Sequence, residues 1–153
     1  MAQGRAISTS FAAIISKIEK DLEGVRDEFL KEVANDLVSE STSPVWSGQY
    51  VTSHSISTSS SAGQFTGNIG GEKFAPRTTV PEAYRAEARA NLMSDIAALP
   101  SLSDRVYISN NAPHARIVEF GGGMTPAYGV FSSVLNRAGI HLQTAISRVK
   151  GGQ

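Results

Sequence analysis

The sequence predicts an α+β domain in which long helices carry a small sheet. Two observations support this class: apolar residues recur at helical spacing in three separate stretches, and short runs of β-branched and aromatic residues lie between them. At 153 residues the chain has the usual length of one domain, so we expect a single domain over 1–153. The expected order is a long N-terminal helix, a small antiparallel or mixed β-sheet with a long loop, a central helix, a short helix and a C-terminal helix.

The first predicted element is a long helix within residues 1–40. Its apolar residues recur in steps of three, four and one from Phe11 to Leu37, which is typical of one helical stripe. A helix of about 33 residues would span roughly 50 Å. Two interpretations stay open: this is simply the longest core helix, or its excess length packs on neighbouring subunits.

The next segment is predicted to leave the helix and form a strand followed by a loop. Pro44 breaks the helix, and the stretch QYVTSHSIST alternates in the way a strand does. Residues 57–80 are rich in Ser, Gly and Thr, with Phe65 and Phe74 scattered among them. This composition favours an extended loop or hairpin that becomes ordered on a partner, a candidate interaction arm, with an ordinary surface hairpin as the alternative.

The second half of the chain is predicted to contain three helices and one strand. Pro81 at the first helical position and Glu82 in the first turn open the central helix. The stretch DRVYISN predicts a short strand, and APHARIVEF a short helix that ends at the glycines 121–123. The stretch from Tyr128 to Lys150 predicts the closing helix.

Charge is balanced over the whole chain but not along it. Residues 1–40 carry eight acidic and five basic side chains, whereas no acid follows Glu119. We expect the acidic and basic parts to attract each other, within one subunit or between subunits. The late cations Arg137, Arg148 and Lys150 are candidates for facing DNA, or they simply favour the negative end of their own helix.

The sequence offers no assembled reaction centre. It has no cysteine, and its histidines His54, His114 and His141 fall in different predicted elements without the spacing of a metal-ligand pair. Neither a nucleophile elbow, a Walker loop nor a dinucleotide fingerprint is present. We therefore expect no enzyme, no metal and no cofactor, and no apolar run approaches the roughly 18 residues that a membrane helix needs.

Two stretches, WSGQYVTSHSIS and RVYISNNAPHARIVEFGGGMTPAYGVFSSVL, resemble the neck or tail-completion proteins of long-tailed, double-stranded DNA bacteriophages. The resemblance covers about two-thirds of the chain, from residue 46 onward. The chain departs from the family pattern at His114, where a tyrosine is usual. The positions that correspond to the family's two signatures are Gly48, Ser55 and Ile56 in the first stretch, and Val106, Asn110 or Asn111, Ala112, His114 (in the place of the tyrosine), Ala115, Val118, Glu119 and Gly121 in the second.

The resemblance implies a structural virion protein that is assembled in the host cytoplasm. It implies a ring, expected to be a hexamer, at the neck of the virion. Its partners would be further copies, the neighbouring head-completion or connector proteins, the tail terminator or tail tube proteins, and genomic DNA passing non-specifically through the lumen, with no membrane. A tail terminator or head-closure ring protein is the alternative, and a small DNA-binding or packaging accessory protein is a further one.

Under this resemblance, the short helix near residue 115 is a joint between subunits and not an active site. We expect its apolar side chains Ile117, Val118 and Phe120 to anchor it in the core, leaving Glu119 free to pair across a subunit boundary. The acidic long helix and the basic C-terminal region are candidates for the two patches that a ring requires. The expected contact residues are Asn110, Asn111, His114, Arg116, Glu119, Gly121, Gly122, Phe65 and Phe74, and those expected to face the DNA channel are Arg137, Arg148 and Lys150.

Overall fold

The computed structural model describes residues 2–59, 77–102 and 105–152. The predicted α+β class is confirmed, with a two-stranded antiparallel sheet among the helices. The expected 57–80 arm, including Phe65 and Phe74, lies largely outside the described residues. The elements are α1 (Ala2–Leu37), α2 (Gln49–Thr52), β1 (His54–Ser57), α4 (Pro81–Ala97), β2 (Tyr107–Asn110), α5 (Ala115–Phe120) and α6 (Val130–Gly151).

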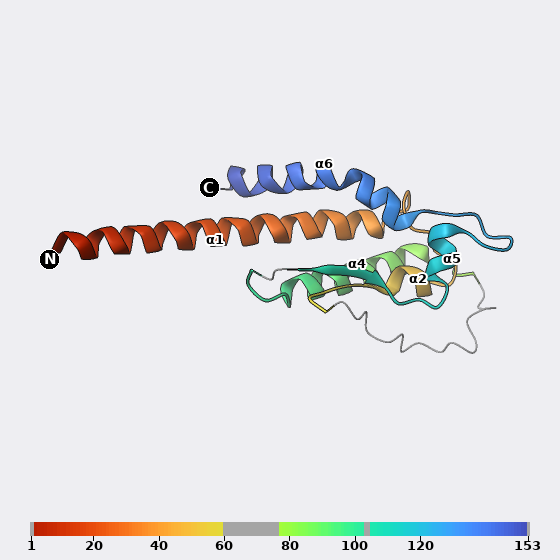
Figure 1. Cartoon of the computed structure of the whole chain (residues 1–153). Coiled ribbons are helices and arrows are strands. Elements are labelled where there is room, and N and C mark those ends of the chain that lie inside the picture. Colours follow the sequence, from red (N-terminus) through yellow and green to blue (C-terminus); the bar gives the residue numbers. More distant parts are fainter. Residues whose placement is uncertain (1, 60–76, 103–104, 153) are drawn as a thin grey trace.

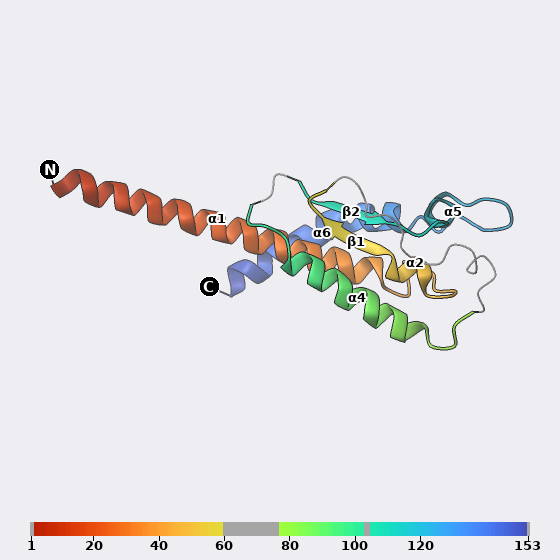
Figure 2. The same ribbon diagram turned by 90° about the horizontal axis from the view of Figure 1, so that it is seen from below.

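Helix α1 forms the middle layer of the molecule. Helix α6 runs antiparallel to it on one side, and α4 with the sheet lies on the other side (Figure 1). The view from below shows that α1 extends well beyond the C-terminal end of α6 (Figure 2). The molecule is therefore elongated, with the N-terminus of α1 at one end and α5 at the other (Figures 1 and 2).

The predicted long helix is confirmed, and it has two different halves. Its C-terminal half forms much of the core, with Leu30, Val33, Ala34 and Leu37 buried. Farther toward the N-terminus the same stripe is exposed, because Ile14, Ile15, Ile18 and Leu22 each keep 53–59% of their surface accessible. Within one chain, α1 is thus a core helix over only part of its length.

The prediction of a strand over QYVTSHSIST is correct for its second half only. Residues Gln49–Thr52 form the short helix α2, which starts at Gly48 with φ 91°. The hydroxyl of Thr52 donates to the carbonyl of Gly48 at 2.9 Å, and that of Ser53 donates to the carbonyl of Gln49 at 2.6 Å. These local hydrogen bonds stabilise a helical turn and outweigh the β propensity of Tyr50 and Val51.

Strand β1 begins only at His54 and pairs antiparallel with β2. The register places His54 opposite Asn110 and Ile56 opposite Ile108. Ile56 is buried in the core that α1 and α4 share. The pairing brings the start of β1 next to the turn that leads into α5.

Helix α4 begins at Pro81 as predicted, and it holds the end of α1 through a buried arginine. Arg85 is 6% exposed, and its Nη1 donates to the carbonyls of Val38, Ser39 and Ser43 at 2.8–3.0 Å. These carbonyls lie just past the end of α1, where a helix leaves acceptors without intrahelical partners. Arg85 therefore acts as a C-terminal cap delivered from another helix.

Across the described ranges, no helix is long and apolar enough to cross a membrane.

Candidate functional site

The two asparagines at the end of β2 fix the turn that leads into α5. Asn110 Nδ2 donates to the carbonyl of Tyr50 at 2.8 Å, and its Oδ1 accepts from the backbone N–H of Ala112 at 2.9 Å. The backbone N–H of Asn111 donates to the carbonyl of Ser53 at 3.0 Å. Both residues thus tie this turn to α2 within the same chain.

A buried histidine lies beneath this turn. His54 is 4% exposed, and its ring meets those of Tyr50 and Phe131 edge-on at centroid distances of 5.2 and 5.6 Å. Asn110 Nδ2 lies 3.2 Å from its Nδ1, an arrangement that assigns the acceptor role to Nδ1 and the proton to Nε2. Burial lowers the pKa of His54 to about 4, so the ring is neutral at pH 7.

His114 completes the same cluster from the first residue before α5. Its ring lies 6.2 Å from that of Tyr50, tilted by 44°. Burial, and then the nearby charge of Glu119, raise the pKa of the Tyr50 hydroxyl. His114 therefore packs against an aromatic ring of its own chain.

The sequence indicated His54 only as one of three histidines. Nothing in the pattern of a strand shows that its imidazole is buried.

The expectation that three apolar residues anchor α5 was wrong for two of them. Val118 is 7% exposed and belongs to the core, but Ile117 is 45% and Phe120 is 72% exposed. A six-residue helix buries a single narrow side, and Phe120 lies about 200° around the helix from Val118. Phe120 consequently points away from the core.

The expectation that Glu119 is free was also wrong. Its carboxylate accepts hydrogen bonds from the backbone N–H of Phe131 at 2.9 Å, the backbone N–H of Ser132 at 3.0 Å and the hydroxyl of Ser132 at 2.6 Å. Burial alone raises the pKa of Glu119, but these hydrogen bonds outweigh it and the net pKa is lowered. Because α6 starts at Gly129, which has no side chain to cap it, Glu119 supplies the cap from α5.

Replacing Glu119 with alanine is expected to lower the free energy of unfolding by about 1–2 kcal/mol, the usual cost of losing an N-terminal cap. The loss can be measured by urea denaturation. Glu87→Ala provides a matched control, since Glu87 is exposed on α4, and it should change stability by less than about 0.5 kcal/mol. Equal stability of the two variants would show that Glu119 does not cap α6.

The glycines after α5 close a compact loop over residues 121–129. Gly121 has φ 75°, and a Cβ placed there would lie 2.9 Å from the backbone nitrogen of Ala127. Gly122 and Thr125 exchange two backbone hydrogen bonds at 3.0 Å, and the N–H of Tyr128 donates to the carbonyl of Val118 at 2.8 Å. The loop returns the chain directly to the start of α6.

Two of the three cations expected to face DNA are used within the chain. Arg137 donates to both carboxylate oxygens of Asp36 at 2.7 and 2.8 Å, and Arg148 pairs with Glu28 and Glu32. The predicted attraction between the acidic and basic parts is thus confirmed within one chain. Lys150 is exposed at the end of α6, and Arg116 is exposed on α5.

Asp36, in the last turn of α1, holds the beginning of α6 through several polar contacts. In addition to Arg137, it accepts from His141 Nε2 at 2.7 Å and Thr42 Oγ1 at 2.8 Å. Burial alone raises its pKa, but hydrogen bonds from Arg137, His141 and Thr42 outweigh that effect and lower the pKa from 3.8 to about 2. The ionised carboxylate therefore stabilises the fold.

We expect Asp36→Asn to reduce the free energy of unfolding by roughly 2 kcal/mol at pH 7, as the lowered pKa implies. A depressed carboxyl pKa contributes stability above the unfolded value of 3.8 and loses it as the pH falls to about 2. The difference from wild type should therefore vanish over that window in urea titrations. Glu40→Gln, at an exposed position, is the control, and a deficit independent of pH would contradict the assignment.

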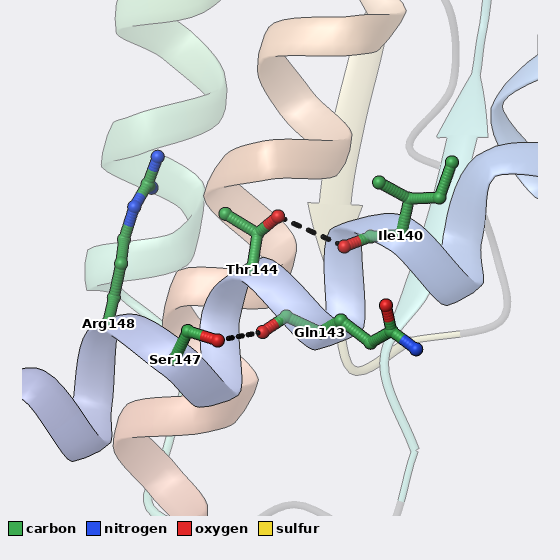
Figure 3. A pocket seen from close by; sticks show the side chains of 5 residues that line it. All are labelled: Ile140, Gln143, Thr144, Ser147 and Arg148. Atoms are coloured by element: carbon green, nitrogen blue, oxygen red, sulfur yellow. Dashed lines mark hydrogen bonds between the residues drawn. The ribbon is translucent and has the colours of Figure 1, made fainter.

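In the described residues, the two best-formed surface pockets bring together no set of reactive side chains. One shallow pocket lies along α6 and is lined by Ile140, Gln143, Thr144, Ser147 and Arg148 (Figure 3). Its two hydroxyls donate to carbonyls of their own helix, Thr144 to Ile140 at 3.0 Å and Ser147 to Gln143 at 2.9 Å (Figure 3). In the part of the chain that the structure describes, no group of three His, Cys, Asp or Glu side chains could hold a metal ion.

Comparison of this chain with protein-family models, with curated proteins and with solved structures finds no significant match. The candidate site is therefore defined by the contacts described above. We call it the α5 joint: the turn at Asn110 and Asn111, helix α5, and the loop 121–129 that leads into α6.

Proposed function

We propose that the protein is a structural component of the head–tail junction of a long-tailed bacteriophage. It would act in the neck or in tail completion, as a ring around the DNA channel that joins the tail to the head. The partners would be further copies of the chain, expected to form a hexamer, together with the proteins of the adjoining head and tail rings. Genomic DNA would pass through the lumen without sequence-specific contacts.

The observation that supports this proposal is that polar residues hold the α5 joint in place while apolar residues of the same joint are exposed. The polar residues of the stretch that resembles the phage family hold α2, α5 and α6 in fixed positions, as the contacts of Asn110 and Glu119 do. Apolar side chains such as Phe120 are left exposed on the same unit. A rigid unit that presents apolar side chains suits protein association, and large exposed apolar surfaces commonly mark such sites.

The alternative of a small DNA-binding accessory protein has less support. Arg137 and Arg148 pair with carboxylates of α1, which reduces the positive charge available for phosphate contacts. Affinity for duplex DNA that falls steeply as salt increases would favour this alternative over the neck assignment.

The test is electron microscopy of lysates from a phage that carries a nonsense codon in this gene. Filled heads and complete tails lying unjoined would support the neck proposal, and wild-type protein supplied in trans should restore joined particles. Tails of irregular length would favour the tail-terminator alternative, because a terminator stops growth of the tube. Heads that lose their DNA would favour head closure, and normally joined particles would overturn all three assignments.

A further inference from the structure

The N-terminal half of α1 exposes an apolar stripe made of Ile14, Ile15, Ile18 and Leu22, here called the α1 stripe. The stripe continues the line of α1 residues that is buried farther along the helix. Helix α6 ends beside its near edge, where Val149 would lie 3.6 Å from a Cβ placed on Gly24. Beyond that point α1 projects past α6 (Figure 2), so the stripe extends farther than the helix that covers the rest.

The opposite end of the molecule exposes a second apolar set, made of Ile117, Phe120, Met124 and Tyr128 and here called the loop surface. These side chains are 45%, 72%, 103% and 47% exposed. The loop that carries Met124 and Tyr128 is closed by the backbone pair between Gly122 and Thr125. Because the loop is already ordered by these hydrogen bonds, binding through it costs less conformational entropy than binding through an open loop.

The two surfaces lie at opposite ends of one elongated chain, so they cannot cover each other within it (Figures 1 and 2). A second copy of the chain can bring them together. Two different surfaces of identical chains meet either reciprocally, in a two-fold dimer, or head-to-tail, and a head-to-tail contact whose rotation closes gives a ring.

Acids lie on both edges of the α1 stripe, but Asp21 is on the edge that faces the end of α6, where it lines a hollow with Val149 and Lys150, and Glu19 is on the opposite, exposed edge. Glu19 and Lys17 flank the α1 stripe on opposite edges, because each is one position, about 100°, from Ile18. Arg116 is exposed on α5 next to Ile117, and no acid follows Glu119 in the chain. Glu19 and Arg116 are therefore placed to pair when the stripe meets the loop surface.

We propose that the α1 stripe of one copy binds the loop surface of the next copy, with Glu19 paired to Arg116. This inference rests on the proposed ring and identifies its subunit contact. The apolar residues of both surfaces supply the driving force, and the charged pair sets which edge of the stripe faces α5.

The first test uses the absence of cysteine from the sequence to place a specific cross-link. The double variant Ile18→Cys/Phe120→Cys is expected to form a ladder of disulfide-linked multimers on mild oxidation, ending at the ring number. Each single variant should give at most a dimer. A double variant that gives no ladder, in a protein that still assembles, would overturn the contact and leave the ring proposal standing.

The second test separates the charged pair from the apolar contact, by sedimentation and native mass spectrometry of the full chain. Glu19→Arg and Arg116→Glu should each weaken assembly about tenfold, and the double variant should restore it. Lys17→Glu, on the other edge of the stripe, is the matched control and should assemble like wild type. Glu19→Arg and Arg116→Glu variants that assemble like wild type would overturn the inference, whereas a wild-type chain that stays monomeric at every concentration would overturn the proposed ring itself.

Discussion

Gly48→Ala is expected to destabilise the protein by roughly 2–5 kcal/mol, because the substitution combines backbone strain with a steric clash. Gly48 has φ 91°, a conformation that residues with a side chain rarely adopt. A Cβ at this position would lie 2.4 Å from Cδ1 of Tyr84, whose ring packs against the core. Either the ring or the start of α2 must move, and thermal or urea unfolding of the variant measures the cost.

Gly139→Ala is the matched control for this prediction. No atom outside its own helix lies within 4 Å of a Cβ at Gly139, in the middle of α6. Alanine is the better helix former there, so the variant should gain up to about 1 kcal/mol. Adding Tyr84→Ala to Gly48→Ala should relieve the clash but not the backbone strain. A Gly48→Ala variant as stable as the control would refute the geometry at the start of α2.

The long helices could be predicted from the sequence because their signal is repeated many times. The apolar stripe from Phe11 to Leu37 contains no proline and predicts one continuous helix. For α4, the proline at position 81 marks where the helix begins. The short helix α2 could not be predicted in this way. Its four residues have strand propensity, and the hydrogen bonds that make them helical depend on the turn at Gly48.

The polar contacts between the long helices could not be predicted from the sequence for a different reason. Asp36 and Arg137 are 101 positions apart, and their pairing depends on how α6 lies along α1. The sequence indicated opposite charge in the two regions but not which residues meet. The cap that Arg85 provides for α1 had no sequence signal, because a helical pattern does not show which cation enters the core.

At α5, the roles of polar and apolar residues are the reverse of what the sequence suggested. We expected the apolar residues to anchor the helix and Glu119 to reach a neighbour. Instead Glu119 is held by α6, and Phe120 is exposed. A short helix with a single buried position has too few apolar contacts to fix itself, so polar contacts to neighbouring elements hold it in place. Its remaining apolar side chains are then available to a partner.

Acidification from about pH 6.5 to pH 4 is expected to remove roughly 3 kcal/mol of stability through His54 alone. The unfolded chain protonates this histidine near its ordinary pKa of 6.5, but burial lowers the pKa in the folded protein to about 4. Between these values the unfolded state binds the additional proton, so stability falls as the pH falls. The contribution is fully present above pH 6.5.

His54→Phe isolates this effect, because phenylalanine keeps the edge-on packing against Tyr50 and Phe131 but cannot take up a proton. Urea unfolding of wild type and variant at several values between pH 7.5 and pH 4 should give a difference that shifts steadily in favour of the variant. Asp36 does not interfere, since its contribution declines only below pH 3.8. His54→Leu serves the same purpose if phenylalanine is too large. A difference that is constant with pH would mean that the pKa of His54 is the same in the folded protein as in the unfolded chain.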